Sequence, residues 1–231
     1  MARTAEELKR LAAEKAALFL GDVRVLGLGT GSTAKHFVDV VGEMWQSGAL
    51  QDLVAIPTSL ATEEQARGLG IPLTDLDAHP QLDVTVDGAD EVSRELDLIK
   101  GLGGALTREK IVASASRELI IVADDSKLVS RLGERSPLPV EVLPFGFRTV
   151  EIRLRQLGAE PELRRQDGAP FVTDQGNWIL DCSFPDGIAD AEGMARAIDG
   201  TPGVIAHGLF LGMATRVVVA AAGGVRIIER P

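Results

Sequence analysis

Residues 29–33 combine two features that bind a small phosphate group. They read Gly-Thr-Gly-Ser-Thr, after a short apolar run and before an amphipathic one, so we expect a turn from a strand into a helix. Such a turn presents backbone N–H groups at the positive end of the helix dipole. An ordinary tight turn is the alternative, but the hydroxyls of Thr30, Ser32 and Thr33 favour phosphate binding.

The same turn does not fit two common nucleotide-binding motifs. A dinucleotide fingerprint counted from Gly27 needs a glycine where Ser32 stands, and an acid after the next strand, where residues 56–59 read Ile-Pro-Thr-Ser. A P-loop needs a Gly-Lys-Ser/Thr sequence, which does not follow. The turn therefore suits a phosphate monoester better than a nucleotide.

A second segment places three carboxylates within five residues, directly after an apolar strand. They are Asp87, Asp90 and Glu91. Close carboxylates repel one another, so one of them can stay protonated and serve as an acid. A solvated turn with a helix N-cap at Asp90 is the alternative, because acid-rich turns are common.

A third segment, residues 100–104, brings backbone N–H groups and a cation together in the sequence Lys-Gly-Leu-Gly-Gly. Glu109 lies five residues beyond this turn, on a helix expected over residues 105–118. Taken alone, the run Arg-Glu-Lys at 108–110 is typical of a solvated helix face, and Lys127 of an exposed lysine.

Strands alternate with helices around these segments. Strands are expected at residues 23–28, 53–56, 82–86 and 119–123, and helices at 4–19, with a Thr4–Glu7 capping box, at 34–45, near 62–64 and at 105–118. This alternation predicts a parallel sheet covered on both faces. Ligands bind at the carboxyl ends of such strands. The polar clusters at 29–33, 87–91 and 124–127 can therefore converge on one edge.

The pattern changes near Arg131, where prolines 137, 139 and 144 interrupt the chain. A helix at 147–157, a strand at 160–164, a hairpin around 174–177, a half-buried strand from Trp178 to Cys182 and a helix at 190–199 indicate a small α+β domain. Residues 217–221 and 225–228 flank Gly223 and Gly224 as a second hairpin, which we assign to the first domain.

Composition narrows the classes of function. The 231 residues carry 34 acidic and 24 basic side chains, a net charge of −10, which argues against nucleic-acid or anionic-membrane partners. An anionic substrate must then meet a locally basic pocket. Cys182 is the only cysteine, which fits a reducing cytoplasm, and the three scattered histidines predict no metal site. The charged start resembles no signal peptide, and no apolar run is long enough for a membrane span.

In order and spacing, the polar segments resemble the ribose-5-phosphate isomerase A family over nearly the whole chain. The matching segments are 29–33 (GTGST), 86–91 (VDGADE), 99–101 (IKG), 104–110 (GALTREK), 125–127 (DSK), 138–142 (LPVEV), 174–177 (DQGN) and 202–204 (PGV). The resemblance implies conversion of D-ribose 5-phosphate to D-ribulose 5-phosphate in the pentose phosphate pathway through an enediolate, without cofactor or metal. It also implies a cytoplasmic homodimer or homotetramer.

The resemblance further implies a fold and a set of site residues. The fold is α/β: a Rossmann-like three-layer domain over residues 1–130 and 208–231, and a smaller α+β domain over 131–207 involved in oligomerisation. Glu109 is the expected catalytic base, with Asp87, Asp90 and Lys100 as further catalytic residues. The expected substrate-binding residues are Thr30, Gly31, Ser32, Thr33, Asp87, Gly88, Ala89, Asp90, Lys100, Gly101, Leu102, Gly103 and Lys127. The family usually has glycine at Leu102, so we expect a stiffer turn there.

Two other functions compete with the isomerase. A sugar-phosphate-sensing domain of a regulator shares the fold, but it would need a DNA-binding helix-turn-helix module, and only about 20 residues precede the first expected strand. A sugar-phosphate deaminase or acyl-CoA transferase on the related fold is disfavoured by the complete set of isomerase segments.

Overall fold

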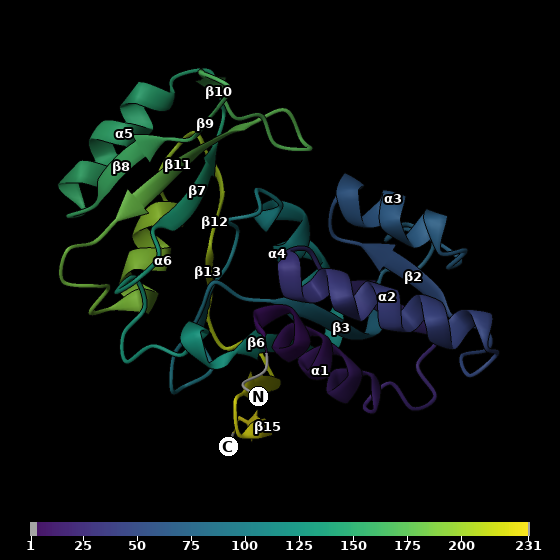
Figure 1. The fold of residues 1–231 in the computed structure, drawn as a ribbon. Coiled ribbons are helices and arrows are strands. Elements are labelled where there is room, and N and C mark those ends of the chain that lie inside the picture. The colour runs from purple at the N-terminus through teal and green to yellow at the C-terminus, as the bar shows by residue number, and fades with distance from the viewer. Residues whose placement is uncertain (1–3, 231) are drawn as a thin grey trace. The chain divides into compact units, whose positions relative to one another are not determined.

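The computed structural model describes residues 4–230, and Figure 1 shows their fold. The chain forms two compact units. Unit 1 comprises the residues up to Ala89, Arg108–Lys127 and those from Met213 onward, and unit 2 comprises Asp90–Thr107 and Leu128–Gly212. No helix among the described residues is both long and apolar enough to cross a membrane.

Unit 1 is built on a six-stranded sheet in the order β15-β14-β6-β3-β1-β2. Its strands are β1 (Val25–Leu28), β2 (Val54–Pro57), β3 (Leu82–Gly88), β6 (Ser116–Asp124), β14 (Arg216–Ala221) and β15 (Gly224–Glu229). All neighbours pair in parallel except β14 and β15, which form the expected C-terminal hairpin. The apolar centres of every strand except the edge strand β15 are buried, as a sheet covered on both faces requires, so the predicted α/β class is confirmed.

Helices of unit 1 follow the strands as predicted. They are α1 (Ala5–Ala17), α2 (Ser32–Gln46) and α3 (Leu60–Gly68), with the short helix η1 (Asp125–Lys127) after β6, and helix α4 (Leu106–Ser114) begins in unit 2 and continues in unit 1. The capping box is present, because Thr4 N–H donates to Glu7 and Glu7 N–H donates to Thr4 Oγ1. Small and apolar residues of α1 and α2 pack with β1 and β3 in one core.

The helix expected at 105–118 is shorter than predicted. It ends at Ser114, and residues 116–118 open strand β6. The cause is the register with β3, which pairs Leu82 with Ser116 and Val84 with Glu118. Ser116 Oγ also donates to the carbonyl of Val112 at 2.8 Å, which closes the helix.

Unit 2 combines antiparallel sheets with two helices. A four-stranded antiparallel sheet has the order β12-β7-β11-β8, with a three-stranded sheet β13-β5-β4 and a ribbon β10-β9. The strands are β4 (Glu91–Val92), β5 (Leu98–Ile99), β7 (Leu138–Val142), β8 (Glu160–Leu163), β9 (Arg165–Gln166), β10 (Ala169–Pro170), β11 (Trp178–Ser183), β12 (Val204–His207) and β13 (Leu209–Phe210). Helices α5 (Phe147–Gln156) and α6 (Ala191–Asp199) contribute to a core with β7 and β11.

Two details of unit 2 differ from the expectation. Residues 90–107 belong to this unit, because β4 and β5 form one small sheet with β13. Residues 174–177 do not join two paired strands, as was expected of a hairpin there. A hairpin is formed earlier in the chain instead, by β9 and β10. Residues 174–177 form a turn in which Gly176 N–H donates to Thr173 O, and the strand that follows, β11, pairs with β7 and β8.

Candidate active site

The loop after β1 meets the end of β3 at the carboxyl edge of the sheet. Gly29 is necessary there, since a Cβ at this position would lie 2.4 Å from the Cα of Asp87. Thr30 N–H donates to Asp87 Oδ1 at 2.9 Å, and Gly29 N–H donates to Val86 O at 2.9 Å. Two of the predicted segments are thus joined by direct hydrogen bonds.

Hydroxyl groups fix the side chain of Thr30. Its Oγ1 lies 2.7 Å from Thr58 Oγ1 and donates to Ser59 Oγ at 2.9 Å. Thr62 Oγ1 in turn donates to the carbonyl of Gly29 at 3.0 Å. These three partners stand at the junction of β2 and α3, in the segment where a dinucleotide site would carry an acid. Their role was not predicted from the sequence, although a run of hydroxyl residues after a strand is a usable signal.

A cavity of about 490 Å³ adjoins this loop within unit 1. Its lining includes Thr30, Gly31 and Ser32, with the exposed cation Lys35 and side chains of α3. Gly31 occupies the N-cap position of α2 at φ +113°, and no side chain caps that helix. The N–H groups of the first turn of α2 are therefore potential phosphate donors beside this cavity.

The three carboxylates of residues 87–91 have separate surroundings. Asp87 is fully buried, and its Oδ1 also accepts from Gly88 N–H at 2.7 Å. Glu91 is equally buried, and its carboxylate accepts three backbone N–H groups at 2.6–2.7 Å. Those donors belong to Gly133, Arg135 and Ser136, so Glu91 anchors the loop that leads into β7. It serves structure rather than chemistry.

Asp90 lies beside the turn at residues 100–104. Its Oδ2 accepts from Leu102 N–H at 3.0 Å, and its own N–H donates to Ile99 O. A strand, β4, follows it, so the alternative of a helix N-cap is wrong. Asp90 and the Gly-rich turn therefore form one group within unit 2.

Glycine is required at two positions of this turn. Gly101 and Gly104 have φ values of +104° and +83°, and Gly104 N–H donates to Gly101 O at 2.9 Å. A Cβ on Gly104 would lie 2.5 Å from the ring of Phe171. Lys100 is 2% exposed, and its Nζ lies 5.5 Å from the ring centroid of Phe210, a cation–π contact.

Glu109 is buried in α4, with 4% of its surface exposed, whereas Arg108 and Lys110 beside it are half-buried. A solvated helix face does not describe this carboxylate. Lys127 closes η1, directly after β6. Because β6, β3 and β1 are parallel neighbours, the segments after them lie on the same edge of the sheet of unit 1.

Two buried or half-buried charged residues of unit 2 were not selected from sequence. Glu141 in β7 is fully buried and accepts hydrogen bonds from Thr107 Oγ1 (2.5 Å), Thr173 Oγ1 (2.8 Å) and Asn177 Nδ2 (2.9 Å). Arg164 is the second, and its Nη1 donates to carbonyl oxygens of the turn at 100–104. The available signal for Glu141 was a single acid in an otherwise apolar strand.

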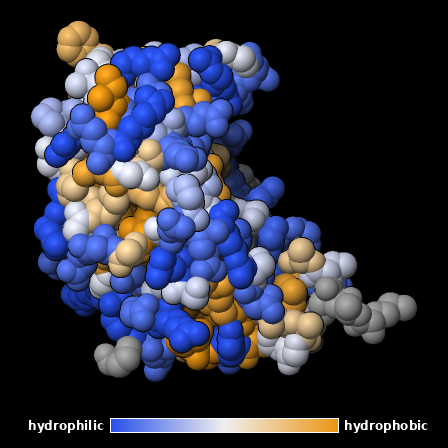
Figure 2. Space-filling model, turned by 90° about the vertical axis from the view of Figure 1, so that its left-hand side faces the viewer, coloured by the Kyte–Doolittle hydropathy of each residue, from blue (hydrophilic) through white to orange (hydrophobic). Residues whose placement is uncertain are grey.

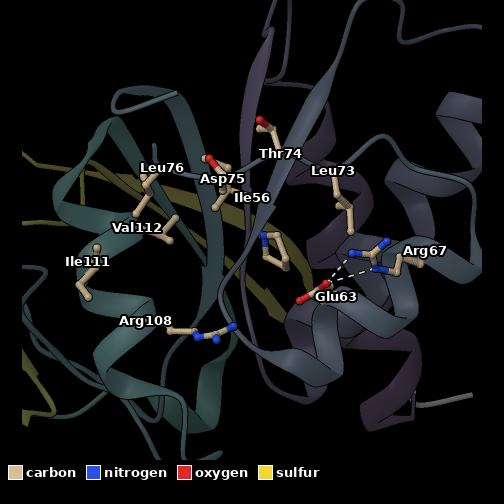
Figure 3. A pocket seen from close by; sticks show the side chains of 11 residues that line it. Ile56, Glu63, Arg67, Leu73, Thr74, Asp75, Leu76, Arg108, Ile111 and Val112 are labelled. Carbon is tan, nitrogen blue, oxygen red and sulfur yellow. Dashed lines mark hydrogen bonds and ion pairs between the residues drawn. The ribbon is translucent and has the colours of Figure 1, made fainter. Parts of the chain in front are cut away.

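A second cavity of unit 1, of about 460 Å³, is lined by residues of β2, α3 and α4 and by residues 73–76. Figure 3 shows the apolar side chains of Leu73, Leu76 and Val112 around it, with Arg67 turned toward Glu63 at 2.7 Å. The lining has two arginines, Arg67 and Arg108, and two acids, Glu63 and Asp75, so its formal charges cancel. This neutral, largely apolar lining suits a phosphate dianion less well than the cavity beside Gly31.

The described residues contain no cluster of three or more His, Cys, Asp or Glu side chains that could hold a metal ion. Burial raises the pKa of the Cys182 thiol, the single cysteine, which keeps it in the protonated and unreactive form.

Comparisons with known proteins cover almost the whole chain. The sequence model described as "Ribose 5-phosphate isomerase A (phosphoriboisomerase A)" matches residues 54–224. Ribose-5-phosphate isomerase A of Roseiflexus castenholzii is 53% identical over 96% of this chain and 95% of its own length. A probable chloroplastic ribose-5-phosphate isomerase of Arabidopsis thaliana is 50% identical over 100% of this chain and 86% of its own length.

Solved structures agree with the sequence relatives. A D-ribose-5-phosphate isomerase in complex with phospho-erythronic acid superimposes with a TM-score of 0.96 at 40% identity, over 99% of this chain and 100% of its own. The ribose 5-phosphate isomerase A of Methanocaldococcus jannaschii has a TM-score of 0.93 at 39% identity, over 98% of this chain and 100% of its own.

Proposed function

The chain belongs to the ribose 5-phosphate isomerase A family, as its sequence segments predicted, and we propose that it interconverts D-ribose 5-phosphate and D-ribulose 5-phosphate in the pentose phosphate pathway. The burial of Glu109, on a helix turn whose neighbouring charged residues are half-buried, is the observation that carries this proposal. Family membership decides against the sensor domain and against the deaminase or transferase.

The substrate phosphate binds at the loop of residues 30–33. Support comes from the uncapped first turn of α2, the cavity beside it and the exposed ammonium of Lys35. Lys9, a further candidate cation, lies 2.7 Å from Glu6 and does not line that cavity. The solved relative holds phospho-erythronic acid, a phosphorylated sugar acid, and we infer that this chain accepts the same class of ligand.

Ring opening precedes proton transfer, because the closed furanose has no carbonyl group. Asp87, or Asp87 and Asp90 as a coupled pair, exchanges protons with the ring oxygen and the anomeric hydroxyl. The fixed position of the Asp87 carboxylate, held by two backbone N–H groups, supports this role.

Glu109 then carries a proton between C2 and C1 through an enediolate. One carboxylate can serve both carbons because it is short and reaches two neighbouring atoms. Lys100 and the N–H groups of residues 101–103 stabilise the negative oxygen of the enediolate. Gly88, Ala89 and Lys127 complete the substrate contacts.

The reaction needs no cofactor or metal in this proposal, since proton transfer supplies the whole chemical change. We also propose a homodimer or homotetramer. Unit 2 carries exposed large apolar side chains, and Figure 2 shows apolar patches among hydrophilic ones on one face. The exposed large apolar side chains of unit 2 are Leu143, Phe145, Ile152, Val172 and Ile205. Such patches often mark interfaces. A cytoplasmic location is part of the proposal, although one relative is named chloroplastic.

Turnover of ribose 5-phosphate by the purified protein tests the proposal. Glu109→Gln keeps the shape and removes the basicity, so it should lower kcat by at least about 10²-fold with KM changed little. The control is Glu118→Gln, on β6, whose side chain is 52% exposed; it should keep the wild-type rate. A folded Glu109→Gln protein with near-normal kcat would refute the assigned base.

A further inference from the structure

Arg164 connects two distant parts of unit 2. Its Nε and Nη2 donate to the two carboxylate oxygens of Asp181 at 2.8 and 2.5 Å. Its Nη1 donates to the carbonyl oxygens of Gly101 and Leu102 at 3.2 and 3.0 Å. The side chain is only 13% exposed. A planar guanidinium with five N–H donors can make all four bonds at once, and a lysine cannot.

These bonds fix the direction of the N–H groups in the Gly-rich turn. In a planar trans peptide, the C=O and N–H groups point to opposite sides. The carbonyls of residues 101 and 102 face Arg164, so the N–H groups of Leu102 and Gly103, which share those two peptides, face away from it. The bond from Leu102 N–H to Asp90 Oδ2 at 3.0 Å agrees with this direction.

The N–H of Gly103 has no hydrogen-bond partner among residues 4–230, and Gly103 is exposed. It is therefore available to a ligand oxygen. The positive charge of Arg164 on the carbonyl side polarises both peptides and makes their N–H groups stronger donors. Phe171 supports the same side of the turn, since its ring lies 5.7 Å from the guanidinium and against Gly104.

We propose that Arg164, held by Asp181, is a positioning residue for the isomerisation. It orients the N–H group of Gly103 toward the substrate oxygen that becomes negative in the enediolate, and through the N–H group of Leu102 it holds the carboxylate of Asp90 in place. This inference rests on the proposed function.

Arg164→Lys is the test variant, because it keeps the positive charge and removes the planar guanidinium that makes the four hydrogen bonds. Donors that act on the enediolate matter more in the transition state than in the ground state. We expect kcat to fall at least 10-fold and KM for ribose 5-phosphate to stay within threefold. The inhibition constant of phospho-erythronic acid, whose carboxylate resembles the enediolate, should rise by about the same factor as kcat falls.

The matched control is Arg165→Lys on the next residue. Arg165 is exposed, and its only side-chain hydrogen bond among the described residues goes to Gly168 O at 3.0 Å, so this variant should keep wild-type kinetics. Asp181→Asn is the second test variant. It keeps the size of the side chain while weakening the hold on Arg164, and we expect a smaller change in the same direction.

The outcomes separate this inference from the proposed function. A folded Arg164→Lys protein with kcat within twofold of wild type would overturn the inference, and so would a loss of kcat with an unchanged inhibition constant. If Arg164→Lys does not fold, Asp181→Asn decides by the same two measurements. An inactive Glu109→Gln beside a fully active Arg164→Lys would leave the isomerase intact and remove only the positioning role.

Discussion

The loop after β1 and the turn after β5 both present backbone N–H groups, but they are held in different ways. The loop is fixed by neighbours in its own sheet, chiefly Asp87 and the hydroxyls at the start of α3. The turn is fixed by Arg164 and Phe171, more than 60 residues further along the chain. Neighbouring strands of unit 1 and the start of α3 place the loop, whereas the turn depends on the packing of unit 2.

The difference extends to function. In the proposed mechanism the loop binds the phosphate, which is the same in substrate, transition state and product, so its loss should appear in KM. In the same proposal the turn stabilises an oxygen that becomes negative only during the reaction, so the loss of the turn should appear in kcat. Substitutions in the two segments therefore test whether the loop acts on KM and the turn on kcat.

The largest effect is expected from Gly29→Ala. The new Cβ would lie 2.4 Å from the Cα of Asp87, so β1 and β3 must move apart. Overpacking of this kind costs about 1–3 kcal/mol or more, and activity should fall more than about 10²-fold because Asp87 and the loop shift together. Thermal unfolding and kcat/KM are the measurements.

Gly68→Ala is the control for that change. Gly68 ends α3, and a Cβ there would meet no atom within 4 Å. It should be neutral or slightly stabilising, since alanine favours a helix over glycine. Wild-type stability and activity in Gly29→Ala would show that the two strands do not need their close approach.

A smaller effect is expected when Ser32 and Thr33 are both replaced by alanine. KM should rise about 10-fold while kcat stays within about threefold, because phosphate contacts are common to ground and transition states. Ser47→Ala, at the other end of α2, removes a hydroxyl that donates to Met44 O and should leave KM unchanged. A fall in kcat with a normal KM would show that the loop, like the turn, acts in the transition state and not in phosphate binding.

The smallest effect concerns Asp83, which joins β3 to the start of β1, away from the carboxyl edge. Hydrogen bonds from Val25 N–H and Arg24 N–H lower the pKa of Asp83 below its usual value. A lowered folded-state pKa gives stability above the unfolded value, near 4, which is lost as pH falls through the folded pKa. The side chain is 35% exposed, so screening keeps the contribution below about 1 kcal/mol.

Asp83→Asn should therefore lower stability slightly at pH 7, and the difference from wild type should shrink in acid. Urea unfolding at pH 7 and near pH 3 measures both. KM and kcat at pH 7 should not change. A difference that grows as pH falls would have the wrong sign for this assignment.

Much of unit 1 could be predicted from sequence because its signals are local. The Thr4–Glu7 capping box, the alternation of strands and helices and the C-terminal hairpin each lie within a few residues. The two-residue strands β4 and β5 could not be predicted, because each is very short and the second partner of β5, strand β13, lies about 110 residues away. The burial of Glu109 was equally invisible, since 108–110 reads as a charged helix turn.

The roles of Glu91, Glu141 and Arg164 were not visible for the same reason. Their partners lie 32–63 residues away, apart from Asp181, which lies 17 residues from Arg164. Sequence patterns report periodicity and nearby turns, whereas these side chains are explained by contacts that exist only after folding.

Exchange of the C2 proton of ribose 5-phosphate with deuterated water tests the central claim, proton transfer by Glu109, most directly. NMR follows the loss of the C2 proton signal with wild-type protein and with folded Glu109→Gln. A carboxylate that removes and returns this proton predicts exchange with the wild type and none above background with the variant. Exchange by Glu109→Gln at the wild-type rate would contradict the account.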